Sequence, residues 1–240
     1  MADYSEDYLL NKRIKIFQPI DGYRAAIDAV LAAAAVTGVR PLDTILDLGS
    51  GTGAISLCLA ARYPQNEITG IEIQPQLAEL SNLSVQANGF TNLHYLNQDI
   101  FAASIPFCSF AHVVTNPPYF DSSMPTSPKS GKATAHNFKQ AGLREWLNIC
   151  IKMVQPQGYL YIVNRAEALD EILNSLHGRM GEIRIFPFCS KEGQDVKRIV
   201  VRARKDSKAP LTIAPETVIH RADGQYTPAA EAILRDGNCL

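Results

Sequence analysis

The sequence predicts an α/β fold: a mostly parallel, seven-stranded sheet that ends in a C-terminal antiparallel hairpin. From residue 44 onward, short β-branched runs alternate with longer amphipathic stretches, which is the pattern of βαβ units. Two later runs alternate in polarity around a polar loop, as antiparallel strands do. A chain of 240 residues with 46% hydrophobic side chains is long enough to bury one large core.

The strands follow one another in a regular order. Five parallel strands are expected first, at residues 44–48, 67–73, 93–97, 111–116 and 158–163. The hairpin is expected at 181–188 and 197–205, with residues 189–195 as its loop. Residues 120–138 are rich in Ser, Pro, Gly and Lys and lack periodicity, which predicts a long loop.

The N-terminal segment is expected to stand apart from this alternation. Residues 25–36 read "AAIDAVLAAAAV", which predicts an Ala-rich buried helix too short to cross a membrane. We therefore expect residues 1–40 to form a helical cap segment and residues 41–240 to form one compact domain.

Charge and cysteine content exclude several classes of protein. The 23 basic and 24 acidic side chains nearly cancel, so overall charge gives no sign of non-specific nucleic-acid binding. Five widely spaced cysteines without a C-x-x-C pair argue against a disulfide framework and a zinc site. The sequence shows neither a signal-peptide pattern nor a membrane span. We expect a cytoplasmic protein without metal or membrane contact.

A glycine-rich turn follows the first strand, in "ILDLGSGTGAISLCLA". Gly49, Gly51 and Gly53 permit a tight turn and close approach of a ligand, and Glu72 follows about twenty residues later, where a carboxylate can bind a ribose. Two ligands compete, a dinucleotide and an adenosyl cofactor without pyrophosphate. Because the loop lacks the G-x-G-x-x-G spacing and carries Asp47, which would repel pyrophosphate, S-adenosylmethionine is favoured.

A third strand end contributes "NQDIF". Asp99, or the backbone amide beside it, is placed to meet an adenine, because ligands of doubly wound sheets bind at the carboxyl ends of the strands. The other interpretation of Asp99 is a helix N-cap. The predicted cofactor site also includes the neighbouring Ile73 and Ile100.

A stiff turn, "TNPPYF", follows the fourth strand. Pro117 and Pro118 lack N–H groups and fix their own φ, so this stretch cannot continue a strand. The Asn116 side-chain oxygen and the Pro117 carbonyl could each accept a hydrogen bond from one of the two N–H groups of a planar amine. This would aim the lone pair of the nitrogen at a methyl sulfonium. Tyr119 and Phe120 would stack on the substrate. The structural alternative is a rigid turn with a packed tyrosine.

The ordered motifs "DLGSGTG", "GIEI", "NQDI" and "NPPY" resemble those of the Rossmann-like class I S-adenosylmethionine methyltransferases that act on planar amino groups. The resemblance implies that the glycine loop and Glu72 bind the cofactor and that Asp99 binds its adenine. It also implies that residues 116–119 hold the target amine, with Asn116 bordering the cofactor as well. The class includes adenine-N6, guanine-N2 and protein-glutamine enzymes.

The segment "IFQPIDGYRAAIDAVLAAAA" resembles the short pre-domain segment of the bacterial tRNA adenine-37 N6-methyltransferases. This resemblance implies that Gln18, Arg24 and Asp28 reach the cofactor's amino acid end; the alternative is an i,i+4 ion pair between Arg24 and Asp28. It also implies methylation of an adenosine N6 in tRNA. Glutamine methylation of a release factor and guanine-N2 methylation of ribosomal RNA remain the alternatives.

A basic stretch near the hairpin agrees with an RNA partner. Basic residues outnumber acidic ones between positions 184 and 208, and Lys197 and Arg198 are the predicted phosphate contacts. The other interpretation is an edge strand that its charges protect from aggregation.

Overall fold

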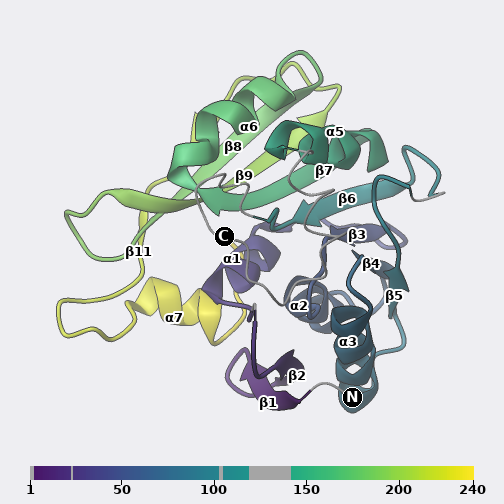
Figure 1. The fold of residues 1–240 in the computed structure, drawn as a ribbon. Coiled ribbons are helices and arrows are strands. Elements are labelled where there is room, and N and C mark those ends of the chain that lie inside the picture. Colours follow the sequence, from purple (N-terminus) through teal and green to yellow (C-terminus); the bar gives the residue numbers. More distant parts are fainter. Residues whose placement is uncertain (1–2, 23, 103–104, 119–141) are drawn as a thin grey trace.

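A mixed sheet runs through the centre of the protein (Figure 1). The structure is a computed structural model that describes residues 3–22, 24–102, 105–118 and 142–240. Within these residues the sheet has nine strands in the order β10-β8-β9-β7-β6-β3-β4-β5, and β11 also pairs with β8. The predicted α/β class with a mostly parallel sheet is confirmed.

The parallel half of the sheet contains the five strands predicted first. β3 pairs with β4 and β6, β4 with β5, and β6 with β7, all in parallel. Their bounds are Ile45–Leu48 (β3), Ile68–Glu72 (β4), Leu93–Asn97 (β5), Phe110–Thr115 (β6) and Val154–Arg165 (β7). The carboxyl ends of these strands therefore share one edge of the sheet.

The predicted antiparallel hairpin closes the other half. It consists of β8 (Met180–Cys189) and β9 (Val196–Lys205), and β9 lies between β7 and β8, antiparallel to both. Two short strands, β10 (Thr212–Ile213) and β11 (Thr217–Val218), pair in parallel with β8. The sheet thus has two more strands than expected, both short and both on the outer edge of β8, because elements of two residues carry no periodic signal.

Helices cover both faces of the sheet (Figure 1). α5 (Leu143–Met153) lies on one face with α6 (Leu169–Leu176), which a short 3-10 turn, η1 (Ala166–Ala168), precedes. The other face carries α1 (Ile27–Ala35), α2 (Ala54–Arg62), α3 (Pro75–Asn88) and α7 (Pro228–Leu234). Ala32, Ala33 and Ala34 of α1 are fully buried, so the Ala-rich helix is a core helix as predicted. No helix within the described ranges is long and apolar enough to cross a membrane.

The helical prediction for residues 1–40 is wrong outside α1. Residues 4–19 form an antiparallel hairpin of β1 (Tyr4–Leu9) and β2 (Ile14–Pro19). The outer edge of β2 is satisfied by α3: Lys15 N–H donates to Asn88 Oδ1 (2.9 Å) and Phe17 N–H donates to Ser84 Oγ (3.0 Å). A distant helix therefore stabilises a strand that the local sequence marks weakly. The domain boundary at residue 40 stays a prediction.

Candidate functional site

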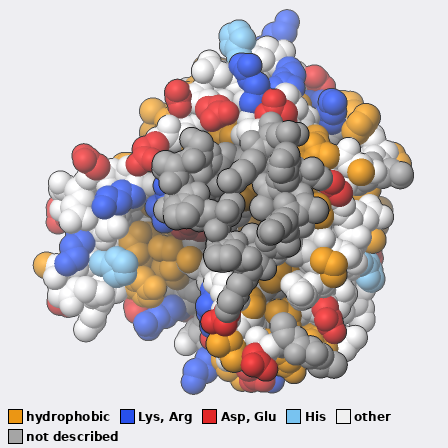
Figure 2. Space-filling model, viewed as in Figure 1, with side chains coloured by type: hydrophobic (Ala, Val, Ile, Leu, Met, Phe, Trp, Pro, Cys, Tyr) orange, Lys and Arg blue, Asp and Glu red, His pale blue; other side chains and the backbone are white. Residues whose placement is uncertain are grey.

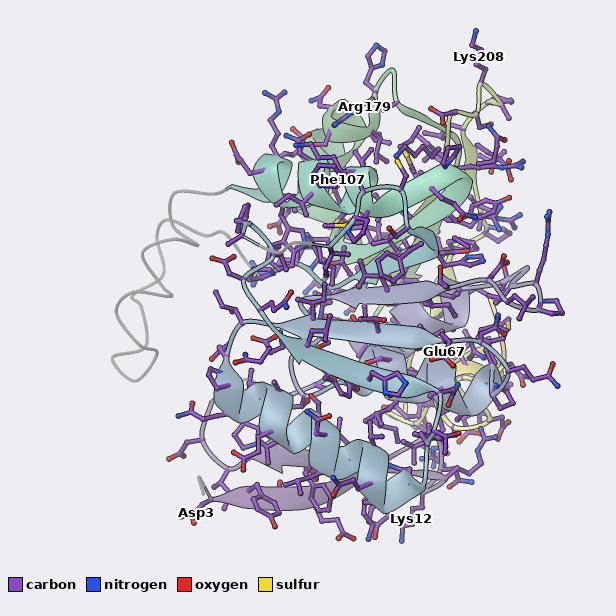
Figure 3. The ribbon with its side chains drawn as sticks, turned by 90° about the vertical axis from the view of Figure 1, so that its right-hand side faces the viewer. Asp3, Lys12, Glu67, Phe107, Arg179 and Lys208 are labelled. Carbon is purple, nitrogen blue, oxygen red and sulfur yellow. The ribbon has the colours of Figure 1, made fainter. Side chains whose placement is uncertain are left out.

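The predicted site segments meet at the edge where the parallel strands end. Figure 3 shows the strands lengthwise and places Glu67, just before β4, at the opposite edge. β3 and β6 are neighbours, and their last residues, Leu48 and Thr115, are paired. The glycine loop after β3 and the Asn116 turn after β6 therefore leave the sheet side by side.

Glu72, the last residue of β4, stabilises the glycine loop through hydrogen bonds to backbone N–H groups. Its Oε2 accepts a hydrogen bond from Gly51 N–H (2.9 Å), and its Oε1 accepts one from Gln74 N–H (2.8 Å). Burial raises the pKa of the Glu72 carboxyl, while these backbone donors oppose the shift. A carboxylate offers about four lone-pair sites, so Glu72 is a residue type that can bind loop amides and a ligand hydroxyl together.

The three loop glycines have different reasons for being glycine. All three lie in the left-handed region, with φ of 74° at Gly49, 57° at Gly51 and 84° at Gly53, so they differ only in what a side chain would meet. A Cβ on Gly49 would approach the Trp146 ring to 2.7 Å, and one on Gly53 would overlap the Tyr95 phenol, whose Cζ would be 2.7 Å away. A Cβ on Gly51 would meet no atom within 4 Å among the described residues. Only Gly51 thus faces space that a ligand could occupy.

Asp47 is buried beneath the loop with part of its carboxylate unpaired. Its Oδ2 accepts a hydrogen bond from Ser56 N–H (3.1 Å). Its Oδ1, Ser50 Oγ and Thr52 Oγ1 are buried without a hydrogen-bond partner in the described part of the chain. Burial raises the pKa of Asp47 to about 7. Unpaired buried polar atoms are costly, so this cluster suits a polar ligand that would satisfy them.

The end of β5 lies against the end of β4. Asn97 Nδ2 donates to the carbonyls of Glu72 (2.8 Å) and Ile73 (3.0 Å). Asp99 Oδ1 accepts a hydrogen bond from the backbone N–H two residues ahead (2.9 Å), so this carboxylate stabilises a turn and no helix begins at it. Ile73, directly after Glu72, is half-buried, and Ile100, directly after Asp99, is buried. The structure thus brings these predicted adenine contacts to the same edge as the glycine loop.

The acceptor turn begins directly after β6. Asn116 is half-buried, Pro117 is buried and Pro118 is exposed. The predicted stacking residues Tyr119 and Phe120 lie outside the described residues, as does the loop expected at 120–138.

Two residues that the sequence interpretation missed join the two halves of the site. Trp146 Nε1 on α5 donates to Thr115 Oγ1 (2.9 Å), which in turn donates to the Leu48 carbonyl (2.8 Å). Trp146 is the only tryptophan in the chain, but only the fold shows that it contacts the glycine loop.

Gln18 lies in the N-terminal segment with both ends of its amide engaged. Its Oε1 accepts a hydrogen bond from Ala25 N–H (2.8 Å), and its Nε2 donates to Asp7 Oδ2 (3.1 Å). Arg24 also binds the Asp7 carboxylate. Gln18 therefore connects the β1–β2 hairpin to the segment just before α1. Its contact with a cofactor stays a prediction.

Asp28 pairs with a residue of the sheet. Arg198 Nε donates to both carboxylate oxygens of Asp28, at 3.1 and 3.0 Å, and this carboxylate is buried. Arg24 pairs with Asp7, so the alternative interpretation, an i,i+4 ion pair between Arg24 and Asp28, is wrong. Lys197, the other predicted phosphate contact, is exposed.

Most other basic side chains of β9 are engaged within the protein. Arg202 and Arg204 pair with Glu182, and Lys205 Nζ donates to the carbonyls of Ile151 (2.9 Å) and Val154 (2.6 Å). Figure 2 shows Lys and Arg side chains interspersed with Asp and Glu on the face seen there. The basic stretch in the sequence therefore does not form a uniform basic surface.

The chain is similar to curated methyltransferases. It is 30% identical over 235 residues to a tRNA1(Val) (adenine(37)-N6)-methyltransferase of Porphyromonas gingivalis, a match that covers 90% of this chain and 89% of that protein. A release factor glutamine methyltransferase of Escherichia coli is 42% identical, but over 81 residues, which are 34% of this chain and 29% of that protein.

The fold comparison agrees. A solved structure described as a predicted O-methyltransferase, protein Atu636 from Agrobacterium tumefaciens, is similar with a TM-score of 0.74 and 26% identity, covering 89% of this chain and 98% of that chain. The family model described as methyltransferase small domain matches residues 30–184. The class predicted from the four motifs is confirmed: the chain belongs to the methyltransferase small domain family.

Proposed function

We propose that the protein transfers a methyl group from S-adenosylmethionine to the N6 amine of an adenosine in tRNA. The observation that carries this proposal is the pairing of Leu48 with Thr115, because it places the glycine loop and the Asn116 turn on adjacent strand ends. Similarity over about nine tenths of both chains to a tRNA adenine-N6 enzyme supports the choice of substrate. Such a substrate would place the reaction in the cytoplasm.

The cofactor would lie along the ends of β3, β4 and β5. When bound, S-adenosylmethionine supplies an electrophilic methyl group on a sulfonium. Glu72 would accept hydrogen bonds from the ribose hydroxyls, and Gly51, which has no side chain, would let the cofactor approach the loop backbone closely. The buried polar atoms of Asp47, Ser50 and Thr52 suit the charged amino acid end. The remaining proposed contacts are the adenine contacts Ile73, Asp99 and Ile100, the loop glycines Gly49 and Gly53, and Gln18 and Asp28 of the N-terminal segment.

The acceptor would be held by the turn after β6. An exocyclic amine is a poor nucleophile because its lone pair is delocalised into the ring. The Asn116 side-chain oxygen and the Pro117 carbonyl would accept hydrogen bonds from its two N–H groups. These two hydrogen bonds would favour a pyramidal nitrogen. Pro118 keeps the turn rigid, and Tyr119 and Phe120 would stack on the base. The amine proton can leave to water after transfer, so no general base is needed.

Glutamine methylation of a release factor is the second candidate. The 42% identity over 81 residues to such an enzyme favours this candidate. The side-chain amide of glutamine has two N–H groups, as the adenine amine does, and could donate both to the Asn116 turn. Both candidates therefore use the same donor and acceptor geometry and differ only in what delivers the planar nitrogen.

Lys197 is the phosphate contact we propose first, because it is exposed whereas Arg198 binds Asp28. The ion pairs of Arg202 and Arg204 with Glu182 leave fewer basic groups of β9 to bind phosphates, so RNA recognition would depend on a few defined contacts and on stacking.

The test incubates the protein with methyl-labelled S-adenosylmethionine and either unmodified total tRNA or a release factor, followed by mass spectrometry of nucleosides and peptides. We expect labelled N6-methyladenosine. Label only in a glutamine residue would establish the second candidate. Asn116→Ala should abolish transfer and leave S-adenosylhomocysteine affinity within about threefold, since the acceptor interaction is made in the transition state. Equal loss of both would refute the role of Asn116.

A further inference from the structure

A chain of hydrogen bonds runs through the interior from α5 to the ends of β6 and β3. Trp146 Nε1 donates to Thr115 Oγ1, and the hydroxyl of Thr115 donates to the Leu48 carbonyl. Trp146 is 2% exposed, and the other two residues are fully buried. A hydroxyl has one hydrogen, so these two bonds fix its orientation: the hydrogen points to Leu48 and a lone pair faces the indole. Buried, directed bonds of this kind hold their partners in one arrangement.

Each end of this chain borders one half of the methyl-transfer site. Leu48 directly precedes Gly49, and Thr115 directly precedes Asn116. The Trp146 ring also lies so close to Gly49 that a Cβ there would be 2.7 Å from it. A single side chain therefore contacts the glycine loop through its ring and the residue before the acceptor turn through its N–H.

The hydrogen-bond chain from Trp146 through Thr115 to Leu48 lies where the pairing of β3 with β6 ends. Leu48 and Thr115 are the last paired residues of β3 and β6, so beyond them the parallel hydrogen bonds no longer set the spacing between the loop and the turn. Phe101, after the end of β5, contacts the same indole edge to face, with ring centroids 6.5 Å apart. Trp146 thus lies at the junction of three strand ends. Methyl transfer is sensitive to this spacing, because a misplacement of about 1 Å can cost on the order of 100-fold in rate.

We propose that Trp146 and Thr115 are positioning residues that hold the acceptor turn in register with the glycine loop during methyl transfer. The proposal rests on the proposed function in one respect: it takes the glycine loop as the side of the methyl donor and the Asn116 turn as the side of the acceptor. Neither residue touches the reacting atoms, so their loss should lower the rate of transfer and leave cofactor affinity intact.

The first experiment compares Thr115→Val, which keeps the shape but removes the hydroxyl, with Thr115→Ser, which keeps the hydroxyl. Trp146→Phe removes the indole N–H. Single-turnover transfer is measured with saturating cofactor and substrate, and S-adenosylhomocysteine affinity by calorimetry, at a temperature where urea unfolding shows every variant folded.

We expect Thr115→Val and Trp146→Phe to lose roughly 10- to 100-fold in rate with affinity within about threefold, and Thr115→Ser to stay close to wild type. A Thr115→Val variant that transfers at the wild-type rate would overturn the proposal. So would equal losses in the Val and Ser variants, or a loss of affinity in step with the rate.

A second measurement needs no methyl acceptor. Because the chain has one tryptophan, the ¹⁵N spectrum contains a single indole N–H signal. We expect S-adenosylhomocysteine to shift this signal, since the ring borders Gly49, and Thr115→Val to move its proton upfield by removing the acceptor, while Thr115→Ser does not. A signal insensitive to both changes would overturn the link. A wild-type protein inactive on tRNA would instead refute the proposed substrate, and the indole signal would still decide the link.

Discussion

Replacing Asp47 with asparagine should change how stability depends on pH. Asp47 is fully buried, and desolvation, aided by the nearby charge of Glu72, raises the pKa of its carboxyl from 3.8 to about 7. Because the folded-state pKa lies above the unfolded one, the folded protein holds this proton more tightly. The stability contributed by this group is complete below about pH 4, falls as the pH rises toward 7, and stays at the lower level above that.

The size of the effect follows from the shift. About three pKa units at 1.36 kcal/mol each give a maximum of roughly 4 kcal/mol, of which roughly 2–3 kcal/mol fall between about pH 5 and 7. Asp47→Asn keeps an oxygen to accept the Ser56 N–H and cannot ionise. The stability of the variant relative to wild type should therefore rise by about 1.4 kcal/mol per pH unit over this range. Urea unfolding of both proteins at pH 5, 6, 7 and 8 measures it.

The comparison also isolates Asp47 from other carboxyls. The pKa of Glu72 is raised as well, but Glu72 is present in both proteins, so its contribution largely cancels in the difference. If the cofactor's ammonium lies near Asp47, wild-type affinity for S-adenosylhomocysteine should increase from pH 6 to 8 and that of the variant should not. Parallel stability curves for the two proteins would refute the reasoning, because they would mean that Asp47 is ionised throughout.

Two further predictions concern the loop and the N-terminal segment. Gly53→Ala should destabilise the protein by roughly 2–4 kcal/mol in urea unfolding, because the strain of a positive φ adds to the overlap with Tyr95. Gly51→Ala has only the strain of its φ of 57° and should cost about 1 kcal/mol but weaken cofactor binding; equal losses of stability would contradict this distinction. Arg198→Ala should cost roughly 2 kcal/mol, because it removes the Nε–H that both oxygens of the buried Asp28 carboxylate share, and a double-mutant cycle with Asp28→Ala should show coupling of at least about 1 kcal/mol; additive losses would contradict the pair.

The parallel strands and the edge that carries the site could be predicted from the sequence because their signals are local. Each chemistry-bearing motif directly follows a short run with the residue pattern of a strand, and parallel strands bring their carboxyl ends together. Gly51 and Glu72 were recognisable because a turn with close ligand approach requires their residue types. The order of the sheet then placed Asn116 beside them.

The features that escaped prediction depend on partners distant in the chain. The outer edge of β2 is satisfied by Asn88 and Ser84 of α3, so part of what stabilises the hairpin lies outside residues 1–40. Arg198 looked like a phosphate contact among other basic residues, but its carboxylate partner lies 170 positions away. Trp146 was not among the predicted site residues, because its hydrogen bond to Thr115 exists only once α5 packs on the sheet.

The glycine motif combines two requirements that sequence reasoning treats as one. Gly49 and Gly53 are glycine because of Trp146 and Tyr95, large rings that fill the space a side chain would need. Gly51 is glycine on the open side, where its N–H is held by Glu72 and nothing described fills the space. Two of the three glycines thus serve the packing that holds the loop, and one serves the ligand. A side chain at Gly49 or Gly53 would meet a ring and would also strain a backbone of positive φ, whereas a side chain at Gly51 would enter the space proposed for the cofactor.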